Sequence, residues 1–522
     1  MEQSAVALPP RALNLVSIAG AVVTVVTLAA LLLWPPIAMV AHGIAVPPQA
    51  IVVSTIAIAV SSTLGILVVA GMLAAAVRAR LPGSGIVRAV CRAGLLVPPF
   101  VAPVALLALA GSGALYGGLV DMRVGRPGAI VVAQIFAFLP LAFALITRAL
   151  AAVSTEAEQA AELLGASRWT VLCRVTLGLA RPGLISAACV VLGLCLADVA
   201  TGVLFGAQDL LLAVYIVTPA DSPATWTGGA LVLSALTLTV ALAGGTWRAT
   251  GVPFSGDTSA VGGLTPPAAV RAIVGPLSWL ITAVLVLLWL TVPVASLIAT
   301  RPGWRLTLEH WGEVGRSTSG LANSLLLGLG VAFVGTILAL LVGVVIARGG
   351  GVTAAVTTRL TRVPVVIPGV VAGLGYLLAF GAPHGDLALL VLVVSAWELP
   401  VTASVAAGAL ARSDRAREHA AASLGAGRFT TLWRIVLPSL LPATAWIVGY
   451  GFASGVTAIA TVIAIVSRGR LDLGVADMLL HAVVGPAGPA CAFATALVAL
   501  AGGATLLGRA AAGRESIPTL LA

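Results

Sequence analysis

Lysine is absent from this chain of 522 residues, so all 28 of its basic residues are arginines. The missing lysine excludes a phosphate-binding loop of the G-x-x-x-x-G-K-[ST] type, in which lysine contacts the nucleotide phosphates. It also excludes any reaction that runs through a lysine Schiff base. If the chain uses ATP, a different polypeptide must therefore bind the nucleotide.

Potential metal ligands are few and scattered, because the chain has only five cysteines and five histidines. None of the cysteines forms a C-x-x-C pair, and no histidine lies at ligand spacing from one. Cys189 and Cys195 fall within an apolar segment, where cysteine behaves as a small hydrophobic residue. We therefore expect no catalytic residue, no metal site and no cofactor bound by this chain.

Charged residues are also scarce, at 9% of the chain, whereas 60% is hydrophobic and the mean hydropathy is +1.12. Soluble domains carry about 25% charged residues, so the composition predicts an all-α protein that crosses a membrane many times. A spanning helix needs about 20 largely apolar residues. Twelve segments meet this requirement: 14–41, 51–77, 93–116, 128–151, 183–206, 228–246, 273–299, 321–347, 363–382, 387–411, 443–466 and 489–508.

The net charge of +10 follows the predicted topology. With the N-terminus inside, 21 arginines lie on the cytoplasmic side of the twelve segments. Seven arginines lie outside: Arg123, Arg126, Arg301, Arg305, Arg316, Arg468 and Arg470. An excess of arginine in cytoplasmic loops is typical of multi-pass proteins of the bacterial plasma membrane. We therefore predict that both termini are cytoplasmic, and that the basic charge does not indicate a nucleic-acid partner.

Two cytoplasmic loops, 154–182 and 413–442, repeat one another at an offset of 260 residues. Each loop contains a helical segment, a glycine, a second helical segment and a proline, and a glycine or proline at these places ends a helix. The matched pairs are Ala160 and Ala420, Gly165 and Gly425, Arg168 and Arg428, Arg174 and Arg434, and Pro182 and Pro442. The loops therefore predict two copies of one helix–glycine–helix unit.

The repeat extends beyond the loops, although its offset drifts. Ser54, Gly65 and Arg78 match Ser324, Gly335 and Arg348 at an offset of 270. Two homologous halves of six helices each explain the pattern, and an even number of helices makes them parallel repeats. We predict a first repeat over 1–250, a cytoplasmic linker rich in Gly, Ser, Thr and Pro over 251–272, and a second repeat over 273–522.

Each repeated loop has an apolar face flanked by arginines. Its residues are Leu163, Leu164, Trp169, Leu172 and Val175 in the first copy, and Leu424, Phe429, Leu432 and Ile435 in the second. An exposed apolar patch of this kind indicates a site for a partner protein. The alternative is that the loops pack only on their own membrane helices.

The pattern Ala-Ala-x-x-x-Gly-Ala, followed by an aliphatic residue and a proline, resembles the EAA loop of permease subunits of bacterial ATP-binding-cassette importers. Two such loops in one chain resemble the fused permeases for ferric iron, thiamine and related solutes, which have the type I importer fold. The resemblance implies two copies of an ATPase subunit, which bind ATP and Mg, and an extracytoplasmic solute-binding protein. It implies coupling to the ATPases through Gln159, Ala160, Ala161, Gly165, Ala166, Arg168 and Leu172, and through His419, Ala420, Ala421, Gly425, Ala426, Arg428 and Leu432.

One departure from the family pattern concerns the leading glutamate of the motif. Gln159 and His419 stand at that position, while Glu158 and Glu418 lie one residue earlier. One residue on a helix is a rotation of about 100°, so these acids cannot simply take over the contacts of the missing glutamate.

Polar residues within the membrane segments are candidates for the substrate pathway, because their burial in lipid is costly. Asp198 and Glu398 are the clearest cases, and Asn323 lies in Ala322-Asn323-Ser324, which resembles the family's opening of a core helix. The stretches around Asp198 and Ala458 resemble permeases for ferric iron, thiamine, phosphonate and polyamine, which implies a small polar or charged solute. A structural role at a helix end is the alternative for both acids.

A different class of function also remains open, namely a twelve-helix secondary transporter that is driven by an ion gradient. Such a protein would need several acids or cation sites near the middle of the membrane. It would not need apolar cytoplasmic loops.

Overall fold

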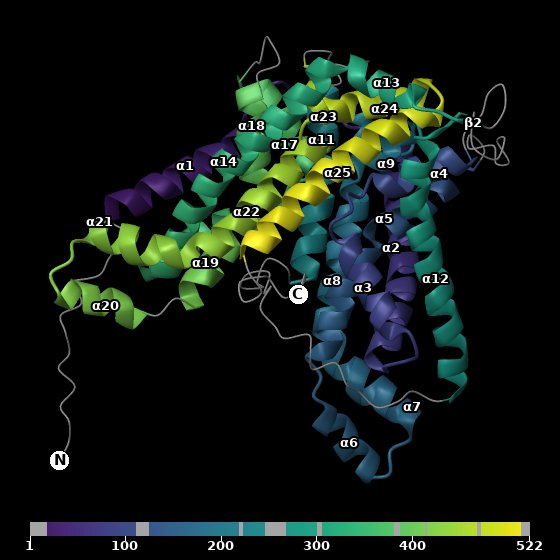
Figure 1. Cartoon of the computed structure of the whole chain (residues 1–522), viewed down its shortest axis with the longest axis horizontal. Helices are drawn as coiled ribbons and strands as arrows, with labels where there is room; N and C mark the ends of the chain where they lie inside the picture. Colours follow the sequence, from purple (N-terminus) through teal and green to yellow (C-terminus); the bar gives the residue numbers. More distant parts are fainter. Residues whose placement is uncertain are drawn as a thin grey trace.

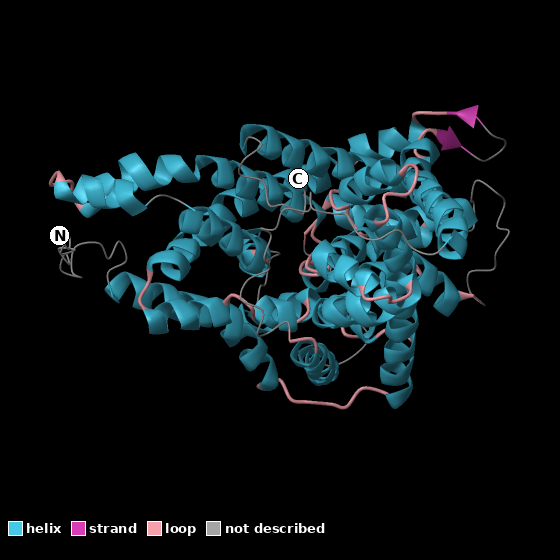
Figure 2. Ribbon diagram, turned by 90° about the horizontal axis from the view of Figure 1, so that it is seen from below, coloured by secondary structure: helices cyan, strands magenta, loops and turns pink. Residues whose placement is uncertain are grey.

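The computed structural model describes residues 18–110, 125–218, 223–245, 268–299, 305–380, 387–412, 415–466 and 471–512. Helices form nearly all of this part of the chain, and two short strands form a hairpin at one end (Figure 2). Residues 251–267 of the predicted linker 251–272 lie outside the described residues. Its last five residues belong to a helix that begins at Ala268.

The described residues of the first half form eleven α-helices and one π-helical segment. They are α1 (Ile18–Val40), α2 (Gln49–Arg78), α3 (Ser84–Gly94), α4 (Val101–Ala110), α5 (Arg126–Ala151), α6 (Thr155–Leu163), α7 (Arg168–Thr170), η1 (Val171–Thr176), α8 (Leu177–Ala197), α9 (Val199–Leu204), α10 (Leu212–Tyr215) and α11 (Pro223–Ala243).

The second half follows in a similar order, with a hairpin and a short helix near its start. Its elements are α12 (Ala268–Ala295), β1 (Ile298–Ala299), β2 (Arg305–Leu306), α13 (Glu309–Arg316), α14 (Thr318–Arg348), α15 (Gly351–Leu360), α16 (Val363–Val366), α17 (Gly369–Phe380), α18 (Leu387–Trp397), α19 (Leu399–Arg412), α20 (Arg415–Ser423), α21 (Arg428–Thr431), η2 (Leu432–Val436), α22 (Leu437–Thr457), α23 (Ile463–Val466), α24 (Gly474–Val484) and α25 (Ala487–Ala512).

Among the described residues, nine helices are long and apolar enough to cross a membrane, and two bent helix pairs raise this number to eleven. The predicted span 363–382 belongs to a pair that bends by 102°, and the span 387–411 is a pair that bends by 57° at Glu398. Pro400 lies directly after the second bend. Proline has no amide hydrogen and so removes a helical hydrogen bond, which favours a bend there. The described residues of the predicted span 93–116 contain the end of α3 and the ten-residue helix α4, with no helix between them, so a continuous helix there is not observed.

The first helix of each half packs against the other half. α1 lies beside α14, α15 and α17, while α12 lies beside α2 and α4 (Figure 1). The sequence of α1 explains one of these contacts: Pro35 has no amide hydrogen and leaves the carbonyl of Leu31 without its helical donor. The Tyr376 hydroxyl donates to that carbonyl at 2.5 Å, which ties α17 to α1.

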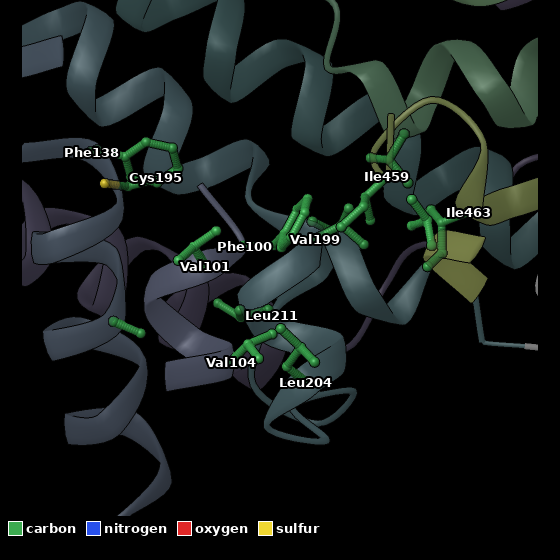
Figure 3. Close-up of a cluster of buried hydrophobic side chains, with 14 of the residues drawn as sticks. Phe100, Val101, Val104, Phe138, Cys195, Val199, Leu204, Leu211, Ile459 and Ile463 are labelled. Carbon is green, nitrogen blue, oxygen red and sulfur yellow. The ribbon is translucent and has the colours of Figure 1, made fainter. Parts of the chain in front are cut away.

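The main hydrophobic core also joins the two halves. It includes Val101 and Val104 of α4, Val199 and Leu204 of α9, and Ile459 and Ile463 from the corresponding region of the second half. Figure 3 shows Ile459 and Ile463 beside Val199, with Leu204 and Val104 below them. This contact closes the seam between the halves with apolar side chains.

Candidate coupling loops and buried carboxylates

The two repeated loops fold in the same way. α6, α7 and η1 connect α5 to α8, and α20, α21 and η2 connect α19 to α22. Figure 1 shows α6 and α20 at two different corners of the molecule, both far from α13 and α24. The predicted helix–glycine–helix unit is therefore present twice.

Gly165 and Gly425 end the first helix of each loop as predicted. Their φ angles are +85° and +82°, a region that favours glycine, and a Cβ at either position would meet no atom within 4 Å. The amide of Ala166 donates to the Ala161 carbonyl at 3.0 Å, and Ala426 donates to Ala421 at 2.9 Å. This six-to-one bond after a left-handed glycine is the Schellman ending of a helix. Glycine is thus required by the backbone and not by a lack of space.

Serine residues start the two helices of the first loop. The Ser154 side chain accepts a hydrogen bond from the Ala157 amide, and Ser167 accepts one from the Thr170 amide at 3.2 Å. These caps satisfy amide groups that have no partner within the helix.

The apolar residues at the glycine turn face away from the protein. Leu163 and Leu164 are each 89% exposed, and Leu424 is 88% exposed in the second loop. Trp169 and Trp433 are exposed as well, and Trp433 is an apolar residue that the sequence comparison did not select. These side chains therefore do not pack on the chain's own helices, whereas Leu172, Val175 and Ile435 of the same predicted faces are half-buried.

The other predicted coupling residues divide by their exposure. Gln159, Ala160, Arg168 and Ala420 are exposed, Ala161, Ala166, Leu172 and Ala426 are half-buried, and Ala421 is buried. Arg168 lies 3.5 Å from Glu162 in an exposed ion pair. His419, Arg428 and Leu432 lie on α20, α21 and η2, but their side chains lie outside the described part of the structure.

Glu158 and Glu418 have a role that the sequence comparison did not assign. Both are buried, and each binds the arginine that ends a long helix: Glu158 pairs with Arg78 of α2 at 2.8 Å, and Glu418 pairs with Arg348 of α14 at 2.7 Å. Gln159 is exposed, so the acids do face a different direction, as the rotation of the helix predicted. The signal was present in the sequence, because both members of each ion pair recur in the repeat.

A π-helical segment follows the second short helix in both loops, over Val171–Thr176 and Leu432–Val436. π-Helical segments are rare in proteins, and those that occur often lie at functional sites. The sequence analysis did not predict either of them.

Asp198 is buried at the break between α8 and α9. One of its oxygens accepts from the Thr201 amide at 3.1 Å and so caps α9, and the other accepts from the Gln134 side chain at 3.1 Å. Gln134 also donates to the Cys195 carbonyl at 3.2 Å. These bonds match the helix-end role that was the alternative to a substrate contact.

Glu398 lies at the bend between α18 and α19 and is half-buried. The Ser454 hydroxyl donates to its carboxylate, and the side chain of Tyr450 also bonds to it. Asn323 lies near the start of α14 and donates to the Asp472 carbonyl at 3.0 Å. The structure thus brings each polar residue to protein partners at a different place, and not into one common site.

No three His, Cys, Asp or Glu side chains gather into a possible metal site within the described ranges. The arrangement instead presents two equivalent loop surfaces, each joined to long apolar helices by a buried ion pair.

Comparison with known proteins finds relatives among membrane transport proteins. Residues 67–246 match the family model described as "Binding-protein-dependent transport system inner membrane component". A putative ferric transport system permease protein of Haemophilus influenzae is 24% identical over 360 residues, which cover 65% of this chain and 56% of the relative. The ferric transport system permease protein of Actinobacillus pleuropneumoniae is 22% identical over 403 residues, which cover 72% of this chain and 58% of the relative.

A shorter match is to the molybdenum transport system permease protein of Escherichia coli, which is 34% identical over 115 residues. These residues cover 21% of this chain and 50% of the relative. The chain thus spans about half the length of the curated relatives that it matches. No solved structure matches the chain. Residues 67–246 are thus similar to the inner membrane components of binding-protein-dependent transport systems.

Proposed function

We propose that this chain forms the membrane pathway of an ATP-binding-cassette importer, and that each repeated loop docks one copy of a separate ATPase subunit. The observation that carries the proposal is the pair of equivalent loops, whose leucines at the glycine turn are 88–89% exposed. Leucines this exposed on a cytoplasmic loop favour a protein partner, because a soluble surface rarely leaves such apolar groups together in water.

Two parallel repeats of six helices would supply the two docking surfaces, over 1–250 and 273–522. The matching order of α5 to α8 and α19 to α22 supports this division. The packing of α1 on the second half and of α12 on the first half supports it as well. Both termini would lie in the cytoplasm, on the side of the two loops.

ATP and Mg would bind only to the partner subunits. Closure of the two ATPases on ATP would draw α6 and α20 together, and the halves would rotate as rigid bodies from an inward-facing to an outward-facing state. The apolar contact of Val199 with Ile459 and Ile463 would then separate and open the seam outward. Hydrolysis would restore the first state.

The solute would be small and polar or charged, of the ferric iron, thiamine, phosphonate or polyamine class. Two of the relatives above are named as ferric transport permeases, which makes ferric ion the first solute to test. An extracytoplasmic solute-binding protein would deliver it. Asp198, Glu398 and Asn323 would then contact the solute only after the rotation frees them from their present partners.

Reconstitution in proteoliposomes tests the proposal. We expect the chain to copurify with an ATPase and to support ATP-dependent uptake of ferric citrate or one of the other solutes in the presence of its binding protein. Leu163→Asp with Leu164→Asp should halve the amount of ATPase that copurifies, because the second loop is left intact, whereas Leu306→Asp, at a residue that is 85% exposed in the β1–β2 hairpin, should not lower it. Uptake by the chain alone, driven by an ion gradient, would instead identify a secondary transporter.

A further inference from the structure

The two buried ion pairs join elements that are not neighbours in the chain. Arg78 is the last residue of α2, and Glu158 lies in α6, 80 residues later. Arg348 is the last residue of α14, and Glu418 lies in α20, 70 residues later. α2 and α14 have 30 and 31 residues, more than the roughly 20 needed to cross the membrane, so both arginines reach its cytoplasmic edge.

Each arginine also binds the end of a second spanning helix. Arg78 donates to the carbonyl of Leu150 in the last turn of α5, and Arg348 donates to Leu410 in the last turn of α19 at 3.0 Å. Carbonyl groups in a last turn have no donor within their own helix. One guanidinium therefore holds together three elements: a long spanning helix, the end of the helix that precedes the loop, and the first helix of the loop.

The glutamate of the first loop extends this connection to the far side of the loop. Thr176, the last residue of η1, donates its hydroxyl to Glu158 at 2.5 Å. In the second loop, the buried Val436 stands at the position of Thr176. The arginine–glutamate pair is thus the feature that both loops share.

Burial makes these pairs different from ordinary surface ion pairs. Their side chains keep only 3–10% of their surface exposed, whereas the pair of Arg126 and Asp209 keeps 30% and 55%. An exposed pair is screened by water and yields easily, but a buried pair resists separation because each lone charge would stay desolvated. A displacement of α6 must therefore carry the end of α2 with it.

We propose that Arg78, Glu158, Arg348 and Glu418 are positioning residues that transmit the movement of each loop to α2 and α14. This inference rests on the proposed docking of ATPases at the loops. Without the pairs, the glycine turns and π-helical segments would absorb the displacement, and the loops would move while the spanning helices stayed in place.

Distances between spin labels separate these two movements in the complex with its ATPase subunits. One label pair, Glu156→Cys and Ala416→Cys, reports on the exposed faces of α6 and α20. A second pair, Val53→Cys and Leu326→Cys, reports on exposed positions of α2 and α14. The exposed Cys173 and the half-exposed Cys189 are replaced by serine in all variants, and ATP with vanadate is the probe.

The informative variant combines Arg78→Met with Glu158→Met, because apolar residues of similar size can replace a buried ion pair without loss of stability. We expect its loops to approach on ATP and vanadate as in the parent, while the shift between α2 and α14 is lost. Glu158→Gln should give the same loss, and Asp209→Asn, which removes the exposed outer pair, should leave both shifts unchanged.

Three results are decisive. An unchanged shift between α2 and α14 in the double variant would overturn the proposal. A double variant that no longer assembles with the ATPase would also overturn it, because the pair would then serve folding alone. If the loops of the parent itself do not approach on ATP and vanadate, the proposed function fails and not the role of the ion pair.

Discussion

Truncation of the exposed leucines of the first loop gives the most direct estimate of how much the loop contributes to docking. Leu163 and Leu164 keep 89% of their surface exposed, so nearly all of it is free for a partner. Truncation of leucine to alanine removes three carbon groups, at about 0.8 kcal/mol each when fully buried, or about 2.4 kcal/mol. If docking buries half of each side chain, the double change costs about 2.4 kcal/mol, or about 50-fold in affinity.

The second loop should respond less to the equivalent change. Ser423 stands at the position of Leu163, so only Leu424 can be truncated at the turn. Leu424→Ala should cost about 1.2 kcal/mol by the same reasoning, or less than tenfold in affinity.

The assay measures the affinity of the purified ATPase for the chain in detergent. Leu306→Ala is the matched control, because this leucine is 85% exposed and belongs to β2, which lies far from α6 and α20 in Figure 1. Since all of these leucines are exposed, the melting temperature of the chain should not change. An affinity that stays within twofold of the parent after truncation of Leu163 and Leu164 would refute the docking surface.

Three further predictions concern single residues. Gly165→Pro should abolish ATP-driven transport while the chain stays in the membrane, because proline holds φ near −65° and the turn needs +85°; unchanged ATPase stimulation and uptake would show that the loop does not couple. His419→Glu places an acid at the position where the family motif has its leading glutamate, so ATPase stimulation through the second loop should change; identical ATPase activity in variant and parent would contradict this. Asp198→Asn keeps a side chain that can cap α9 and removes a charge that costs about 3 kcal/mol within the membrane, so assembly should persist. Uptake of a cationic solute should fall if Asp198 contacts that solute. Normal uptake would show that Asp198 is not part of the substrate pathway.

The sequence predicted the features that depend on local chemistry. Gly165 and Gly425 mark the turns because a left-handed backbone favours glycine. The bend at Glu398 was not predicted, since 387–411 was expected to be one span. Pro400 follows that bend, but Pro140 at the equivalent position lies inside the unbroken helix α5. Tertiary packing therefore decides whether a proline bends or breaks a helix, and the sequence alone does not.

Features that depend on contacts between distant segments were missed. Glu158 was set aside because it lies one residue from the family position, yet that displacement turns it inward to Arg78. The pairing requires knowledge that the ends of α2 and α6 meet, although the shared recurrence of both residues was available. The cap that Asp198 provides for α9 was not missed, because it matches the helix-end role that the sequence left open as the alternative to a substrate contact.

The number of ATPase subunits bound by the purified complex tests the central claim most directly, and native mass spectrometry measures it. The account predicts two ATPase subunits for each chain. It also predicts one subunit after Leu163→Asp with Leu164→Asp, because the second loop is left intact. A complex without any ATPase, or one that keeps both subunits after this change, would contradict the claim that each loop docks its own ATPase.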